Sequence, residues 1–170
     1  ISTAIAVHAL LDWMEFSADA PKAQILATVA ESLRPYLRLE MRSPSGMAPY
    51  SLMLADRRYD TFNPAAYLAG QLQRFSNLQP EPQMATALRN TADATVSVLI
   101  AEKQLSPKRG AWYSNYSIQE KVPNDLPHAS YIALGLSVYS QYGGKLAGSL
   151  INDRILDHLT EFVDSDAKAV

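Results

Sequence analysis

Apolar residues recur every three or four positions along most of the chain, the spacing that gathers them on one face of a helix. In residues 3–16, for example, Val7, Leu11 and Met14 share a face next to Trp13. This pattern predicts an all-helical (all-α) fold of about six helices. The expected helices span residues 3–16, 21–38, 64–76, 82–103, 126–142 and 145–163.

Prolines mark where four of these helices begin. Pro21, Pro64, Pro82 and Pro127 each follow a polar residue by one or two positions. A proline is tolerated there because the first turn of a helix needs no backbone donor. Two glycines at 143–144 end the fifth helix, since glycine readily adopts the left-handed conformation that follows a helix.

The chain also contains a weak internal repeat. With an offset of 64 residues, Tyr67 aligns with Tyr131 and Leu72 with Leu136. The repeated unit is a helix, a short turn, a longer helix and a long returning loop. We therefore expect three helical hairpins stacked as an α/α array within one domain, residues 1–170, because a hairpin cannot bury its apolar face alone. Chance similarity between helices rich in alanine and leucine is the alternative interpretation.

Two long connections, residues 39–62 and 104–124, follow the second helix of the first two hairpins. Both are expected at the end where the first helix of each hairpin begins. Long connections within a compact domain are often functional. Because these two hold many aromatic and charged residues, we expect a functional site at this end.

The composition narrows the classes of function. The net charge of −2 argues against nucleic-acid binding, and the absence of cysteine excludes disulfides and thiolate chemistry. No apolar run reaches the roughly 18 residues that a membrane span needs. The first residues show no secretory leader and begin directly in a helical pattern, so we expect a mature or excised segment of a longer chain.

The densest polar group surrounds the start of the fifth helix. Asp125 is placed to cap this helix, with His128 in the first turn and Tyr131 one turn further along. The positive end of the helix dipole favours a neutral imidazole, which with a nearby phenol makes a candidate acid/base pair. We take these three as candidate catalytic residues. The alternative is structural: a capping Asp, a solvent-facing His and a core Tyr.

Aromatic side chains are concentrated in the second connection. Trp112, Tyr113 and Tyr116, together with Tyr50 from the first connection, suit a platform on which sugar rings stack, and Asn124 offers hydrogen bonds to sugar hydroxyls. Alternatively, these aromatic side chains fold back and fill the core.

Arginines in both connections suit an anionic partner. Arg57, Arg58 and Arg109 are candidates to hold a carboxylate or sulfate, because a guanidinium binds planar anions through two parallel hydrogen bonds. Solvated surface charge is the alternative interpretation of each one.

The remaining histidines carry no chemistry at this stage. His8 falls at a core-facing position, and His158 has the acidic and basic neighbours of a solvated helix face. Three scattered histidines without cysteine give no metal-ligand spacing. The sequence also has no phosphate-binding or dinucleotide-binding glycine motif, so we expect neither a metal nor a cofactor.

Residues 110–114 (Gly-Ala-Trp-Tyr-Ser) and 124–131 (Asn-Asp-Leu-Pro-His-Ala-Ser-Tyr) resemble the (α/α) toroid proteins that process polysaccharides. These proteins include lyases, epimerases and hydrolases. The resemblance is strongest over residues 110–142. It implies a partial (α/α) toroid, a polysaccharide partner and a periplasmic or secreted location.

The resemblance also implies roles for individual residues. Trp112 and Tyr113 would stack on sugars, while Asp125, His128 and Tyr131 would line a cleft. Two features depart from the pattern. The Asn-His or Gln-His signatures of several lyase families are missing, and a complete toroid needs more hairpins than this chain supplies.

The leading hypothesis is therefore a carbohydrate-active or carbohydrate-binding domain that acts on a polysaccharide containing uronic acids. As an enzyme it would be a polysaccharide lyase, an epimerase or a glycoside hydrolase, with an arginine neutralising the substrate carboxylate. A non-catalytic helical-repeat scaffold that binds a protein partner is the alternative. A third possibility is a structural fragment of a larger enzyme, completed by the rest of its chain.

Overall fold

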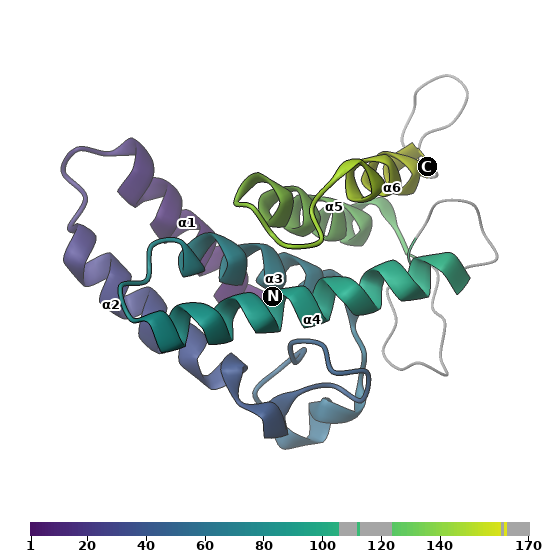
Figure 1. Cartoon of the computed structure of the whole chain (residues 1–170), viewed down its shortest axis with the longest axis horizontal. Helices are drawn as coiled ribbons and strands as arrows, with labels where there is room; N and C mark the ends of the chain where they lie inside the picture. Colours follow the sequence, from purple (N-terminus) through teal and green to yellow (C-terminus); the bar gives the residue numbers. More distant parts are fainter. Residues whose placement is uncertain (106–111, 113–123, 161, 163–170) are drawn as a thin grey trace.

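The computed structural model in Figure 1 describes residues 1–105, 112, 124–160 and 162. Within these residues every regular element is helical, which confirms the all-α prediction. The α-helices are α1 (Ser2–Phe16), α2 (Lys22–Leu33), α3 (Phe62–Ser76), α4 (Pro82–Leu105), α5 (Leu126–Gln141) and α6 (Ser149–Thr160). Three short 3-10 helices, η1 (Arg34–Leu37), η2 (Leu39–Met41) and η3 (Leu54–Arg58), lie between α2 and α3.

Two helices are shorter than the sequence predicts. The second helix ends at Leu33 and continues as the 3-10 turn η1, because Pro35 lacks the backbone donor that an α-helix would use there. The last helix begins at Ser149, four residues later than expected. The backbone reverses first at Gly143, whose φ of 76° lies in the left-handed region that favours glycine.

Helix α3 lies at the centre of the structure (Figure 1). Every one of its residues, from Phe62 to Ser76, is buried, because α1, α4 and α5 all pack against it. The sequence pattern predicts an apolar stripe on one side only. The structure buries polar members as well, including Gln71 and Arg74.

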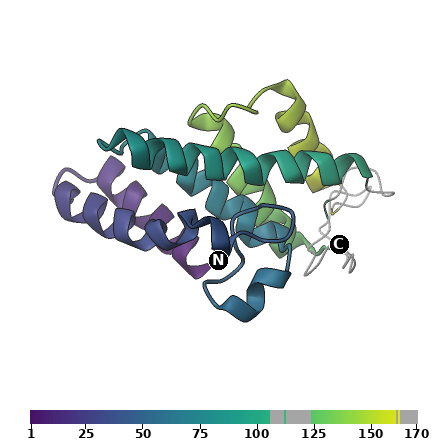
Figure 2. The ribbon, with the colours of Figure 1, turned by 60° about the horizontal axis from the view of Figure 1, so that its bottom comes forward.

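The first helices of the three hairpins run parallel. Near one end, His8 of α1 contacts Tyr67 of α3, which contacts Tyr131 of α5. Towards the other end, Arg74 of α3 reaches Asp12 of α1. Helices α2, α4 and α6 return beside their partners, and Figure 2 shows α4 running along much of the molecule. The N-termini of α1, α3 and α5 therefore lie at one end.

Two glycines allow α3 and α5 to approach at backbone distance. A Cβ atom added to Gly70 would overlap the carbonyl oxygen of Gly135. A Cβ atom added to Gly135 would overlap the carbonyl group of Ala66. The obstacle in both cases is backbone, which cannot move aside as a flexible side chain can.

The connection between α2 and α3 is packed onto the helices. The backbone N–H of Ala48 donates to Thr95 Oγ1 on α4 at 2.9 Å. The Asp60 carboxylate accepts hydrogen bonds from the Ser43 hydroxyl, at 2.6 Å, and from Ser45. These bonds fix the connection beside the N-terminal end of α3.

We predict that Gly135→Ala destabilises the fold by at least about 2 kcal/mol, because overpacking of this kind costs about 1–3 kcal/mol and the opposing atoms are backbone. Urea denaturation would measure the change in the free energy of unfolding. Gly148→Ala is the control, since a Cβ atom there meets nothing within 4 Å. Equal stability of Gly135→Ala and the wild type would contradict the close contact.

Candidate functional site

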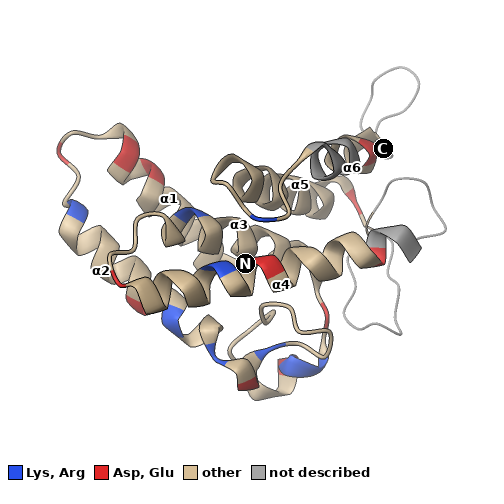
Figure 3. Ribbon diagram, in the orientation of Figure 1, with Lys and Arg blue, Asp and Glu red and all other residues tan. Residues whose placement is uncertain are grey.

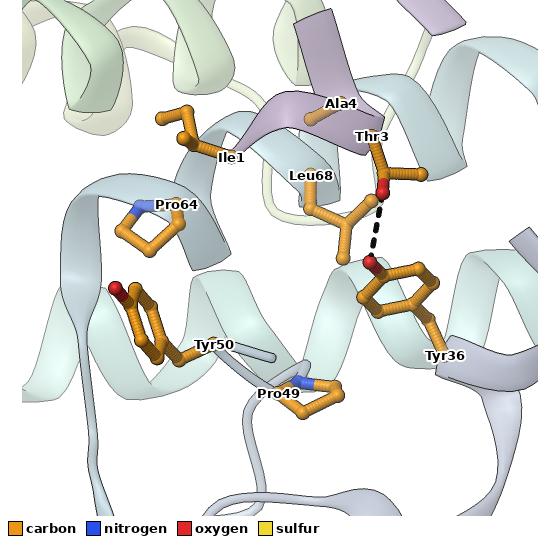
Figure 4. Close-up of a pocket in the computed structure, with 8 residues that line it drawn as sticks. All are labelled: Ile1, Thr3, Ala4, Tyr36, Pro49, Tyr50, Pro64 and Leu68. Atoms are coloured by element: carbon orange, nitrogen blue, oxygen red, sulfur yellow. Dashed lines mark hydrogen bonds between the residues drawn. The ribbon is translucent and has the colours of Figure 1, made fainter. Parts of the chain in front are cut away.

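A cleft opens where α1, α3 and α5 begin, and we call it the N-terminal cleft. Its main pocket has a volume of about 120 Å³. An adjoining pocket, drawn in Figure 4, shares Ile1, Tyr50 and Pro64 with it. The main pocket is lined by Ile1, Tyr50, Thr61, Asn63, Pro64, His128 and Tyr131. The parallel helices thus bring together residues far apart in the sequence.

Two predicted catalytic residues form a pair at the start of α5. Asp125 Oδ1 accepts a hydrogen bond from the backbone N–H of His128 at 2.9 Å, so Asp125 caps the helix. The same oxygen lies 2.6 Å from His128 Nδ1. The backbone N–H of His128, followed by its side chain, lowers the pKa of the Asp125 carboxyl group. The ionised carboxylate accepts a hydrogen bond from His128 Nδ1–H. His128 Nε2 is then left available for a ligand.

The third predicted catalytic residue, Tyr131, is half-buried in the cleft wall. Its ring lies beside that of Tyr67, with the ring centroids 5.8 Å apart. His8 Nδ1 lies 2.6 Å from the Tyr67 hydroxyl, and His8 Nε2 lies 3.4 Å from Asp12 Oδ2. Burial, then the charges of Asp12 and Tyr131, raise the pKa of the Tyr67 phenol. Tyr67 therefore keeps its proton at neutral pH, and its hydroxyl shares a hydrogen bond with His8 Nδ1.

Sequence reasoning missed this second histidine network. It placed His8 at a core-facing position, and the structure does pack His8 against the buried Tyr67, but the hydrogen bond between the two side chains was not predicted. A usable signal was present, because His8 and Asp12 stand four residues apart on one helix face. Their partnership with Tyr67 depends on the packing of α1 against α3.

Two polar side chains in the cleft have no partner among the described residues. Thr61 and Asn63 are 3% and 5% exposed, yet Thr61 Oγ1 and Asn63 Oδ1 make no hydrogen bond. Thr61 directly precedes α3, but its hydroxyl does not cap the helix. Buried polar atoms are usually paired. Both residues line the main pocket, and the two unpartnered oxygens are themselves buried.

Trp112 does not offer a platform for sugars, contrary to the sequence-based expectation. Its side chain is 2% exposed, and its indole N–H donates to the carbonyl oxygen of Leu99 at 2.7 Å. Asn124 donates to the carbonyl oxygen of Trp112 at 3.1 Å, so it holds this backbone in place. The alternative interpretation, an aromatic side chain that folds back into the core, describes Trp112 correctly.

The prediction of a solvated His158 is wrong. This residue is 0% exposed, because α6 packs its ring against Trp112 with the centroids 5.0 Å apart. His158 Nδ1 accepts from the backbone N–H of Trp112 at 3.0 Å, which leaves Nε2–H to donate to the carbonyl oxygen of Ala129 at 3.2 Å. His158 thereby connects Trp112 to α5.

The other predicted binding residues lie elsewhere. Arg57 and Arg58 are exposed and line a different pocket from the N-terminal cleft. Tyr113, Tyr116 and Arg109 lie outside the described residues.

Comparisons with known proteins found no match among family models, curated proteins or solved structures. Across the described ranges, no group of three or more histidine and acidic side chains is placed to hold a metal ion. No described helix combines the length and the apolarity that a membrane crossing requires.

We predict that Asp125→Ala destabilises the fold by about 1 kcal/mol at neutral pH, the usual cost of a lost helix cap. The folded-state pKa of Asp125 is lowered, so its stabilising effect is present above the unfolded pKa and declines as the pH falls through the folded value. The difference from the wild type should therefore shrink in acid. Urea denaturation across a pH series measures it.

Asp125→Asn is the matched control for this prediction. Asparagine caps helices about as well as aspartate but carries no charge, so this variant should keep most of the stability. A penalty for Asp125→Ala that stayed constant from neutral to acid pH would argue against the charged cap.

Proposed function

We propose that this protein binds an acidic polysaccharide in the N-terminal cleft. The observation that carries the proposal is a pocket walled by tyrosines, two of whose lining residues, Thr61 and Asn63, each have a buried side-chain oxygen without a partner among the described residues. An unsatisfied buried polar group costs about 1–3 kcal/mol, so a ligand that pairs with it gains affinity. Sugars supply hydroxyl donors and acceptors for Thr61 and Asn63, and C–H faces that pack on Tyr50 and Tyr131.

The helix ends favour a negatively charged sugar. The N-terminus of a helix carries partial positive charge and free backbone N–H groups. Helix α3 begins at this cleft without a side-chain cap, and α5 begins beside it. A uronic acid carboxylate in the cleft would be stabilised by the uncapped end of α3.

The proposed architecture is a partial (α/α) toroid built from three hairpins. In such an arrangement the first helices form an inner layer and the second helices an outer one. The parallel contacts of α1, α3 and α5, each with its own returning helix, support it. A cleft at the inner-helix N-termini then receives the chain of sugars. A polysaccharide ligand of this kind is consistent with a periplasmic or secreted protein.

The catalytic part of the proposal assigns proton transfer to His128 and Tyr131. His128 Nε2 takes the proton from the sugar carbon next to the carboxylate, while Asp125 holds Nδ1–H. In elimination, the electron pair of that C–H bond forms a double bond, the neighbouring glycosidic C–O bond breaks, and the Tyr131 hydroxyl protonates the departing oxygen. In epimerisation, a proton returns to the same carbon from the opposite face.

A non-catalytic scaffold for a protein partner is the second candidate function. The exposed side chains of Trp13 and Phe16 on α1 favour it, since large apolar residues at a surface often mark contacts. It gives no reason for the unpartnered polar atoms of the cleft, so we place it second.

We predict that Thr61→Val weakens binding of oligogalacturonate about fivefold, the worth of about one hydrogen bond, while leaving the folded protein at least as stable. Stability should not fall because the variant removes a polar atom that already lacks a partner. Titration calorimetry and thermal denaturation measure the two effects. Thr28→Val, on the exposed face of α2, is the matched control.

Two outcomes would contradict the binding prediction. Unchanged affinity of Thr61→Val would remove the cleft as the site. Absence of binding by the wild type to galacturonate, glucuronate and mannuronate oligosaccharides would remove the acidic polysaccharide as the ligand.

We further predict that the wild type releases or exchanges the proton next to the carboxylate of a bound uronate. Elimination would appear as ultraviolet absorbance of the new double bond, and epimerisation as deuterium uptake from heavy water. His128→Gln should abolish either signal without abolishing binding. A wild type that binds but gives neither signal would restrict the function to binding.

A further inference from the structure

A second pocket, about 460 Å³ in volume, lies in the connection between α2 and α3 and shares no residue with the N-terminal cleft. Three arginines, Arg42, Arg57 and Arg58, line it together with a single acid, Glu40. The rest of its lining is Pro44, Leu54 and Ala55. We call it the arginine pocket.

Arg42 is held in place by neutral groups. Its Nη1 donates to the carbonyl oxygen of Gly46 at 3.2 Å, and its Nη2 donates to Thr91 Oγ1 at 2.6 Å. Its Nε is buried and has no hydrogen-bond partner in the described residues. Burial lowers the pKa of this guanidinium, and both of its printed hydrogen bonds go to uncharged oxygens.

Arg57 and Arg58 also lack acidic partners within the described part of the chain. Arg57 Nη1 donates to the backbone carbonyl of Glu40 at 2.7 Å, and so leaves the carboxylate of that residue unused. The Arg58 guanidinium lies over the ring of Tyr59, 4.8 Å from its centroid. Neither forms a salt bridge with another residue that the structure describes.

Arg74, a buried arginine of α3, differs from the arginines of this pocket because it is paired with two acidic side chains. Arg74 donates to Asp12 and to Glu15, each at 2.6 Å. In the connection, the buried acid Asp60 instead accepts from Ser43 and Ser45. The positive charge of the arginine pocket is therefore left for a group from outside.

The arginine pocket belongs to a basic part of an otherwise acidic protein. Residues 34–60 contain five arginines and three acidic residues, although the whole chain carries a net charge of −2. Figure 3 shows basic and acidic positions along this connection, with the adjacent arginines of η3 at its outer edge. The field around the pocket attracts anions.

We propose that the arginine pocket binds an oxyanion, a carboxylate, sulfate or phosphate group, between the guanidinium groups of Arg42, Arg57 and Arg58. Guanidinium groups bind such anions through paired charge-assisted hydrogen bonds. The exposed Leu54 side chain and Pro44 give the pocket an apolar wall for the part of the ligand that carries the anion. This site is separate from the N-terminal cleft and does not depend on a saccharide occupying that cleft.

Titration calorimetry at low salt, with sodium phosphate, sodium sulfate and sodium acetate as separate ligands, tests the proposal on the whole chain. We expect at least one anion to bind at millimolar concentrations, with affinity falling as salt is added. The double variant Arg57→Gln/Arg58→Gln should weaken this binding about tenfold or more, because it removes two of three charged donors.

A matched control removes the same number of charges from the same connection. Arg34 and Arg38 are exposed and do not line the pocket, so Arg34→Gln/Arg38→Gln should change the affinity less than about twofold. Arg42→Lys, which keeps the charge but loses the forked donors, should weaken binding while circular dichroism confirms the fold. These outcomes together support the pocket.

Absence of binding by all three anions would overturn the proposal, and so would equal losses in the two double variants. Loss of anion binding at the arginine pocket can be distinguished from loss of saccharide binding in the N-terminal cleft. Thr61→Val should leave anion binding at the arginine pocket unchanged, whereas Arg57→Gln/Arg58→Gln leaves the unpartnered atoms of Thr61 and Asn63 in place.

Discussion

The close contact between Gly70 and Gly135 determines how the rest of the structure is arranged. It brings α5 against the backbone of α3, and α3 becomes a central rod covered by α1, α4 and α5. Tyr67 and Tyr131, one turn closer to the helix starts, meet as a consequence. Gly70 lies eight residues after the start of α3 and Gly135 nine residues after the start of α5, so this contact places the two helix starts at nearly the same level, beside the N-terminal cleft.

Ion pairs between the buried Arg74 and two half-exposed carboxylates hold the first hairpin against α3. Arg74, 3% exposed, holds carboxylates of both Asp12 and Glu15, two side chains of α1. A buried charge left without its partner is strongly destabilising, so few other alignments of α1 on α3 are tolerated. This alignment also places His8 opposite Tyr67, and so links the ion cluster to the cleft.

Local signals predicted the helices, but contacts between distant residues decided the site. Prolines at 64, 82 and 127 gave three helix starts, and Asp125 was identified as a cap, because both depend on neighbours in sequence. The repeat aligned Tyr67 with Tyr131, and in the structure their rings lie side by side. Burial of Trp112 was one of two interpretations that the sequence left open, and burial of His158 was not predicted, since it results from α6 packing on α5 and on Trp112. The lack of hydrogen-bond partners for Thr61 Oγ1 and Asn63 Oδ1 among the described residues likewise has no signature in the sequence.

The anchoring of the α2–α3 connection has a consequence for ligand binding. Hydrogen bonds from Ser43 to Asp60 and from Ala48 to Thr95 hold the connection in place. Before it, the Tyr36 hydroxyl lies 2.9 Å from the Thr3 hydroxyl of α1. Tyr50 and the arginines of η3 belong to this anchored connection. For the proposed ligands, this anchoring implies that the binding surfaces are formed before the ligand arrives, so that little conformational entropy would be lost on binding. Selectivity would then depend on the fit of the ligand to a preformed shape rather than on a loop that closes around it.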